Sequence, residues 1–178
     1  DLIGRYVELD IENVVGLDKV NEWSDTLAKN LPTPPIRVWH RWRGGIKVWE
    51  EMCRKNDYVG FSGFLIQQGG GAELPLDKIP LFLKIAAEND CKVHGFGFTN
   101  PRQLSSLPFY SVDSSSWMAA QRFGHLHYFD GKSLQSWGPD EIRKKLGCNT
   151  RNFNWKKAIT FSALQWKLYA DYLEKLHG

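Results

Sequence analysis

The chain of 178 residues has few cysteines and no long apolar stretch. No apolar run approaches the ~20 residues that a membrane-spanning helix needs, and the opening DLIGRYVELD lacks the basic-then-apolar pattern of a signal peptide. The three cysteines, Cys53, Cys91 and Cys148, are an odd number at wide and irregular spacing. This argues against a disulfide framework and suits a reducing compartment. We therefore expect a cytoplasmic protein with no membrane segment.

The short motifs of several common enzyme classes are also absent. The sequence contains no HExxH, CxxC or GxSxG, so zinc-hydrolase, dithiol-redox and serine-hydrolase activities have no support. The run Gly69–Gly71 lacks the Lys and Ser/Thr of a phosphate-binding loop, which indicates a flexible loop instead.

Charge is modest, whereas aromatic residues are abundant. The formal net charge is +3, and 42% hydrophobic with 24% charged residues is an ordinary globular balance. Several of the 8 Trp stand beside Arg or Lys, as in the run Trp39–Arg43 (WHRWR). Basic residues interleaved with aromatics can bind phosphates and stack bases. Composition alone favours the plainer alternative, in which the Trp residues are core and the charges are their solvated neighbours.

A repeated strand-then-helix pattern covers most of the chain. Short apolar runs and alternation predict the strands, and helical spacing of apolar residues predicts the helices between them. The predicted strands are Arg5–Ile11, Ile36–Trp42, Tyr58–Phe64, Val93–Phe98 and Phe109–Val112, with a short extra strand at His125–Phe129. The predicted helices are Asp18–Asn30, Ile46–Lys55, Asp77–Asn89, Pro101–Leu107, Ser115–Phe123, Pro139–Leu146 and Asn154–Leu176.

Five such units in series predict an α/β fold with a parallel sheet and right-handed crossovers. Because polar residues gather at the C-terminal ends of the strands, the pattern favours a (β/α)8 TIM-barrel type over a doubly wound sheet. Only about the C-terminal five β/α units would be present, and we expect the N-terminal strands on sequence outside this chain. A smaller open α/β fold is the alternative. Residues 1–130 would form this barrel portion, and residues 131–178 a helical C-terminal extension that packs on it.

The predicted strand ends supply a candidate site, because they converge on one mouth in a barrel. Glycines there leave room for a flat ligand, and carboxylates with a histidine suit nucleophilic or acid–base chemistry. Two of these residues also have a plainer, structural explanation. Asp113 could be the N-cap of a following helix, and His94 could be a core histidine. The strand-end residues are Glu8, Asp10, Glu12, His40, Gly60, Ser62, Gly63, His94, Gly95 and Asp113.

The order of these ends resembles the tRNA-guanine transglycosylases, the queuine tRNA-ribosyltransferase family, and especially their smaller phage-type and DNA-acting relatives. The resemblance covers about residues 5–124 and is strongest in VHGFGFT…PFYSVDSSSW. FYSVDSSSW is similar to the strand that bears the nucleophilic aspartate, here Asp113. YVELDIEN is similar to the strand whose aspartate recognises the base, here Asp10. YVGFSG resembles the glycine strand that contacts the base, and IRVWHRW resembles the strand that usually supplies a glutamine, here His40.

The resemblance implies a pentosyltransferase that replaces guanine in tRNA or DNA with a 7-deazaguanine through a covalent Asp–ribosyl intermediate. Its partners would be the nucleic acid, the 7-deazaguanine base, and either a second copy of the chain or an N-terminal partner segment. The DSG-type motif, which carries the family's second catalytic aspartate, is missing from this sequence. The family's CxCxxC zinc cluster is also missing, so no metal or other cofactor is expected. The implied catalytic residue is Asp113, and the implied substrate-binding residues are Asp10, His40, Gly60, Ser62, Gly63, His94 and Gly95.

Two other functions stay open at this point. A catalytically inactive nucleic-acid-binding or scaffold protein on the same fold would explain the missing DSG-type strand. An unrelated TIM-barrel lyase or hydrolase could use the short link between the last two strands to bind a small phosphorylated substrate.

Overall fold

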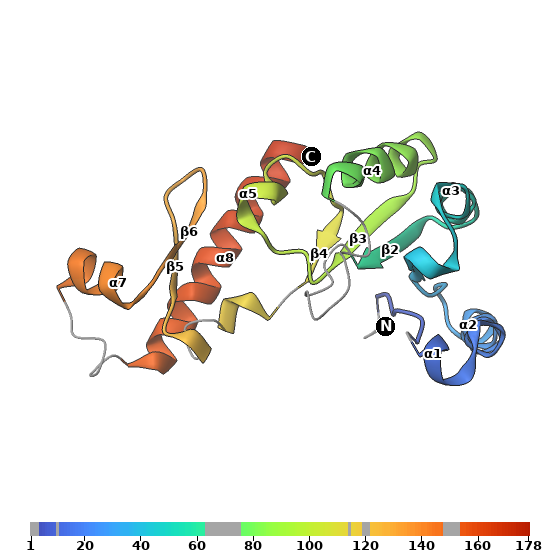
Figure 1. Cartoon of the computed structure of the whole chain (residues 1–178), viewed down its shortest axis with the longest axis horizontal. Helices are drawn as coiled ribbons and strands as arrows, with labels where there is room; N and C mark the ends of the chain where they lie inside the picture. The colour runs from blue at the N-terminus through green and yellow to red at the C-terminus, as the bar shows by residue number, and fades with distance from the viewer. Residues whose placement is uncertain (1–3, 10, 63–75, 114, 119–121, 148–153) are drawn as a thin grey trace. The chain divides into compact units, whose positions relative to one another are not determined.

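A parallel four-stranded sheet is built from the predicted strand–helix units (Figure 1). In the computed structural model, which describes residues 4–9, 11–62, 76–113, 115–118, 122–147 and 154–178, the strand order is β1-β2-β3-β4. Each strand is parallel to its neighbour, so the α/β class is confirmed. The strands are β1 (Arg37–Trp39), β2 (Tyr58–Ser62), β3 (Lys92–Phe96) and β4 (Ser111–Val112).

The strand predicted at Arg5–Ile11 is reduced to one parallel bridge, between Val7 and Ile36. The parallel pairing stops after this bridge because of the next hydrogen bond. There the backbone N–H of Val38 donates to the Glu8 side chain, Oε1, at 2.9 Å, so a carboxylate takes the place of a backbone acceptor. A short helix, α1 (Glu12–Val15), follows, which the sequence pattern did not predict.

Helices connect successive strands much as predicted. The bounds of the helix at Ile46–Lys55 are confirmed. The helix predicted from Asp77 begins as a 3-10 turn, and Pro80 then occupies the first turn of the α-helix, where its missing N–H costs nothing. The elements are α2 (Leu17–Asn30), the 3-10 turn η1 (Arg41–Arg43), α3 (Ile46–Lys55), the 3-10 turn η2 (Leu76–Lys78) and α4 (Ile79–Glu88).

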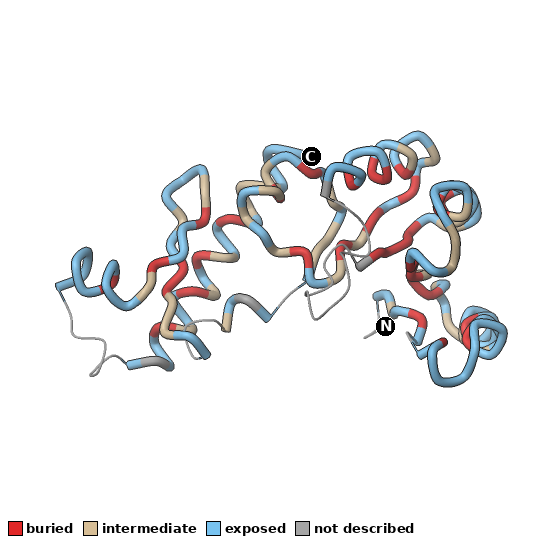
Figure 2. Tube along the Cα trace, viewed as in Figure 1, coloured by how far each residue is buried: buried red, intermediate tan, exposed pale blue. Residues whose placement is uncertain are grey.

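Aromatic rings from the sheet and from two helices form the core beside the sheet. Trp39 and Phe61 contact Trp49 of α3 and Phe82 of α4, with ring centroids 4.9–6.3 Å apart. The Trp49 indole N–H donates to the carbonyl of Phe82 at 2.9 Å, which joins the two helices. Figure 2 shows the buried positions running along β2 and β3. These tryptophans are therefore core residues, as composition favoured.

The second compact unit contains residues 99–108 and 113–178, and the first contains the rest. In the second unit an antiparallel hairpin packs on a long helix, α8 (Trp155–His177). On α8, Ser162 Oγ accepts the N–H of His127 at 3.2 Å, and Gln165 Oε1 accepts that of Phe129 at 2.9 Å. The helix thereby covers a strand edge that would otherwise expose unpaired backbone groups. The hairpin strands are β5 (Leu126–Phe129) and β6 (Leu134–Trp137).

Three shorter elements complete the second unit. The helix predicted at Pro101–Leu107 is shorter, α5 (Pro101–Leu104), and Tyr169 of α8 donates its hydroxyl to the carbonyl of Pro101 at 2.5 Å. Within the predicted helix Ser115–Phe123, the described part contains the 3-10 turn η3 (Ser116–Met118). The helix α7 (Pro139–Leu146) has its predicted bounds.

Two further expectations concern the chain as a whole. The division at residue 130 stays a prediction, and the hairpin β5–β6 passes through that position. Among the residues that the structure describes, no helix combines the length and the apolar character that crossing a membrane requires.

Candidate functional site

The carboxyl ends of the four strands lie along one edge of the sheet, because all four strands are parallel. His40 follows β1 in an extended conformation, with φ −126° and ψ 148°. Asp113 directly follows β4 and is exposed. Asp10 and Gly63 lie outside the described residues, and so does the side chain of Ser62. The predicted roles of these three residues therefore stay predictions.

The two faces of the sheet have different surroundings. Trp39 and Phe61 point toward α3 and α4, which lie on the same face of the sheet. Side chains alternate along a strand, and residues paired across strands share a face. Gly60 precedes Phe61 and pairs with His94, which pairs in turn with Ser111. These three residues therefore lie on the opposite face, which we call the far face.

The glycines predicted to leave room for a flat ligand are packed against the protein's own rings. A Cβ at Gly60 would lie 2.5 Å from Cε2 of Phe96, so the Phe96 ring occupies that space. A Cβ at Gly95 would lie 3.0 Å from Cε1 of Phe109 and 3.1 Å from Cβ of Phe98. The expectation of open space at these two positions is therefore wrong in this structure. The predicted contact of their backbones with a base stays a prediction.

Three polar side chains on the far face form a hydrogen-bonded chain. Ser111 Oγ lies 2.5 Å from Nδ1 of His94 and 2.5 Å from the Tyr58 hydroxyl. Tyr58 is buried, whereas His94 and Ser111 are half-buried. Sequence reasoning singled out His94 alone, because Ser111 lies 17 residues from His94 and 53 residues from Tyr58 along the chain. The alternation of side chains along β2 and β4 places Tyr58 and Ser111 on the far face, but no sequence motif relates these two residues to His94.

The carboxylate of Glu8, from the first predicted strand end, accepts hydrogen bonds from two arginines and from a backbone N–H. Its side chain has no exposed surface. Oε1 accepts from Nη1 of Arg43 at 2.5 Å and from the backbone of Val38, and Oε2 accepts from Nη1 of Arg37 at 3.2 Å. The carboxylate thus ties residue 8 to β1 and the turn after it. Its contacts are those of a structural group.

Glu12 completes this cluster around Arg43. Its Oε1 accepts from Nε of Arg43 at 2.9 Å and from the indole N–H of Trp42 at 3.1 Å. His40 Nε2 lies 3.8 Å from the same oxygen, and the His40 ring stacks on Trp42 with centroids 4.5 Å apart. The predicted base-binding His40 is thus held between a carboxylate and an indole.

Charge pairing fixes the ionisation of this cluster. Burial on its own would raise the pKa of Glu12, but the hydrogen bond and the charge of Arg43 outweigh it, and the pKa falls from 4.5 to about 2. Burial would likewise lower the pKa of Arg43, but hydrogen bonds to Glu12 and Glu8 raise this pKa above its usual value. Glu12 is therefore ionised near neutral pH and has no proton to donate.

The low pKa of Glu12 predicts a specific loss of stability in acid. A carboxyl group whose pKa is lower in the folded state stabilises the fold above its unfolded pKa of 4.5, and loses that contribution as the pH falls toward 2. The contribution at neutral pH is on the order of 3 kcal/mol. We expect the unfolding free energy of Glu12→Gln to fall less steeply than that of the wild type between pH 4.5 and pH 2. Parallel curves from urea titrations across this range would contradict the assignment.

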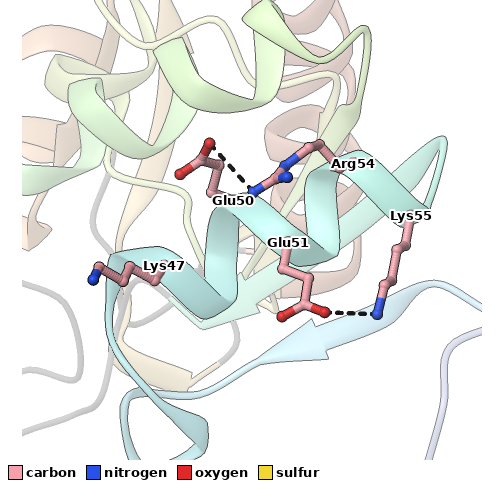
Figure 3. Close-up of a pocket in the computed structure, with 5 residues that line it drawn as sticks. All are labelled: Lys47, Glu50, Glu51, Arg54 and Lys55. Atoms are coloured by element: carbon pink, nitrogen blue, oxygen red, sulfur yellow. Dashed lines mark hydrogen bonds and ion pairs between the residues drawn. The ribbon is translucent and has the colours of Figure 1, made fainter.

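One surface hollow lies along α3 and is shown in Figure 3. It is lined by Lys47, Glu50, Glu51, Arg54 and Lys55. Glu51 pairs with Lys55 at 2.6 Å and Glu50 with Arg54 at 3.5 Å, both at a spacing of four residues. All five side chains belong to one helix and largely neutralise each other, which is typical of a solvated helix face.

Comparison with known proteins returns no relative. No protein-family model, no curated protein and no solved structure matches this chain.

Proposed function

We propose that this chain supplies five β/α units of a (β/α)8-type barrel that exchanges guanine in tRNA or DNA for a 7-deazaguanine. The observation that carries the proposal is the winding of the sheet. Strands β1 to β4 follow each other in sequence order, with α3 and α4 on the same face. Asp113 follows the last of them, on the segment FYSVDSSSW that resembles the family's nucleophile strand.

The winding favours a barrel for a physical reason. Right-handed crossovers that always proceed in one direction place their helices on one face of the sheet. A doubly wound sheet reverses direction at a switch point and has helices on both faces. The order of the four strands contains no reversal. A fifth segment, bridged through Val7 and Ile36, precedes β1 and continues the single direction that a barrel needs.

The proposed chemistry follows the logic of a retaining glycosidase. The Asp113 carboxylate attacks C1′ of the target nucleotide, guanine departs, and a covalent glycosyl–enzyme forms. N9 of the 7-deazaguanine then attacks C1′ and releases the carboxylate. Asp10 would accept hydrogen bonds from N1–H and the exocyclic amine of the base, because a carboxylate has only acceptors. The target nucleotide has to leave its stack to reach such a site.

One observation favours a second candidate, a nucleic-acid-binding protein on the same fold without catalysis. Glu8 and Glu12, the buried carboxylates among the described residues, are both paired with Arg43. Neither is available as the second acid–base group that base exchange needs. Exposed Trp42, which stacks on His40 and stands beside exposed Arg41, suits base stacking without chemistry.

The test is an exchange assay with the full-length protein. Radiolabelled 7-deazaguanine is incubated with tRNA, single-stranded DNA or duplex DNA, and both label in polymer and free guanine are measured. We expect label to enter one of these polymers with release of one guanine per base incorporated. Tight nucleic-acid binding without incorporation would instead support the non-catalytic candidate. Neither binding nor incorporation would contradict both.

A further inference from the structure

His127 is a buried histidine in the second unit, in surroundings that do not suit a charged imidazole. It lies on β5 and is 6% exposed. Its Nδ1 is buried and has no hydrogen-bond partner among the described residues. The ring packs edge-on against the indole of Trp166 on α8, with centroids 5.5 Å apart and planes at 63°. Such a site favours the neutral form of the ring, because a buried charge without a partner is costly.

The elements packed against β5 supply no buried carboxylate to this ring within the described part of the chain. The strand β6 contains no charged residue, and its Ser136 stands opposite His127. On α8, Lys167 follows Trp166, is exposed, and pairs with Asp171 at 2.7 Å. The other charged residues of α8 are all exposed, and they are Lys156, Lys157, Glu174, Lys175 and His177.

The titratable groups on the hairpin itself also oppose a charge on His127. Asp130, in the turn of the hairpin, accepts two backbone N–H groups of that turn. His125 lies two residues before His127, and its Nδ1 is 3.2 Å from Ser136 Oγ. Burial lowers the pKa of His127 below its ordinary value, and the charge of His125 lowers it further. The His127 ring is therefore neutral near neutral pH.

His127 also stands where the hairpin is joined to α8. Its backbone N–H donates to Ser162 Oγ at 3.2 Å, and that of Phe129 donates to Gln165 Oε1 at 2.9 Å. These two hydrogen bonds, together with the contact between the His127 and Trp166 rings, hold β5 on the helix. If β5 separated from α8, the imidazole would be exposed to water, where it takes up a proton without a burial cost.

We propose that His127 makes the packing of the hairpin β5–β6 on α8 sensitive to pH, so that mildly acidic solution releases the strand from the helix. The step is the uptake of one proton from water by the imidazole, and no covalent bond between heavy atoms changes. The released form would expose apolar residues that are buried together in the packed form, namely Leu126, Trp137, Ile142 and Ala158. The inference concerns the second unit alone and does not depend on base exchange.

The direction of the pH dependence follows from the lowered pKa of His127. Well above about pH 6.5, the ordinary pKa of histidine, the ring is neutral in the packed and the released forms, so the packing is at its most stable. As the pH falls below this value, the released form binds a proton that the packed form resists. The ratio of released to packed protein should then rise by up to about tenfold per pH unit, until the pH reaches the pKa of the packed form.

The first test measures the titration of His127 in the full-length protein. Its ring resonances are assigned through their bonds to the His127 backbone and followed by nuclear magnetic resonance as the pH is lowered from neutral. We expect a pKa below the ordinary value of about 6.5. A pKa at or above that value would overturn the proposal, because the packed form would then bind the proton as readily as the released one.

The second test measures release of the strand through hydrogen exchange at the amide of Phe129, which is bonded to α8. After correction for the intrinsic pH dependence of exchange, we expect protection to fall by roughly 10-fold between pH 7 and pH 5. His127→Phe keeps a ring against Trp166 but binds no proton, so its protection should stay constant over this range. The matched control is His125→Gln, which should retain most of the decrease.

Constant protection in the wild type, or an equal decrease in His127→Phe, would overturn the role of His127. If His127→Phe does not fold, the titration of His127 in the wild type still decides the proposal.

Discussion

Asp113→Asn is expected to abolish base exchange while the protein stays folded. Asparagine has nearly the shape of aspartate but no carboxylate to attack C1′, and losing a group of the covalent machinery costs on the order of 10⁴–10⁶-fold in rate. Asp113 is exposed, so the substitution should change the unfolding free energy by less than about 0.5 kcal/mol. The measurement is the single-turnover rate of guanine release from the polymer that the wild type uses.

Asparagine is chosen because it separates the two interpretations of Asp113. Asn caps a helix about as well as Asp, so a purely capping role predicts a variant with normal activity and stability. The matched control is Asp140→Asn, at an aspartate whose side chain is 95% exposed on α7. It should leave exchange unchanged. Full activity in Asp113→Asn would show that this residue is not the nucleophile.

Arg43→Met is expected to produce the largest loss of stability in the first unit. The Arg43 side chain is 7% exposed and pairs with Glu8 and Glu12, whose side chains are 0% and 5% exposed. Removing the guanidinium leaves Glu12 without its arginine partner and Glu8 with Arg37 as its remaining ion pair, and breaking a buried pair typically costs about 3–5 kcal/mol. Methionine retains the length of the apolar stem, so the effect is mainly electrostatic. Urea unfolding followed by circular dichroism measures it.

Two further variants identify the cause of that loss. Arg41→Met changes an exposed arginine in the same 3-10 turn, and we expect an effect below about 0.5 kcal/mol. Glu8→Gln/Glu12→Gln/Arg43→Met removes all three charges, and it should recover part of the stability because no unpaired charge remains. If the triple variant is less stable than Arg43→Met alone, unpaired charge is not the cause.

Local patterns in the sequence were sufficient to predict most of the sheet and its helices. The apolar runs at β2 and β3 and the helical spacing of α3 each reflect one-sided burial, and α3 has its predicted bounds. The strand β6 was missed because only its ends, Leu134 and Trp137, are buried, which leaves no alternation to detect. The first strand was overestimated because the Glu8 carboxylate replaces a backbone acceptor, a substitution that no periodicity reveals.

Within the candidate site, the sequence indicated which residues stand at strand ends but not what surrounds them. Gly60 and Gly95 were interpreted as space for a ligand, whereas Phe96 and Phe109 pack there. Glu8 and Glu12 were interpreted as carboxylates available for chemistry, but Arg43, which lies 35 and 31 residues further along, binds both. Such pairings depend on tertiary packing, because the partners are distant in sequence and carry no common motif.

The most direct test of the account is mass spectrometry of the protein stopped by acid during turnover. After protease digestion, we expect the peptide containing Asp113 to carry the mass of the pentose-linked nucleic-acid fragment, attached to that carboxylate. The adduct should be missing from Asp113→Asn and should disappear from the wild type when excess 7-deazaguanine is added before the acid. An adduct on another residue, or exchange that proceeds with no adduct at all, would contradict the assignment of Asp113 as the nucleophile.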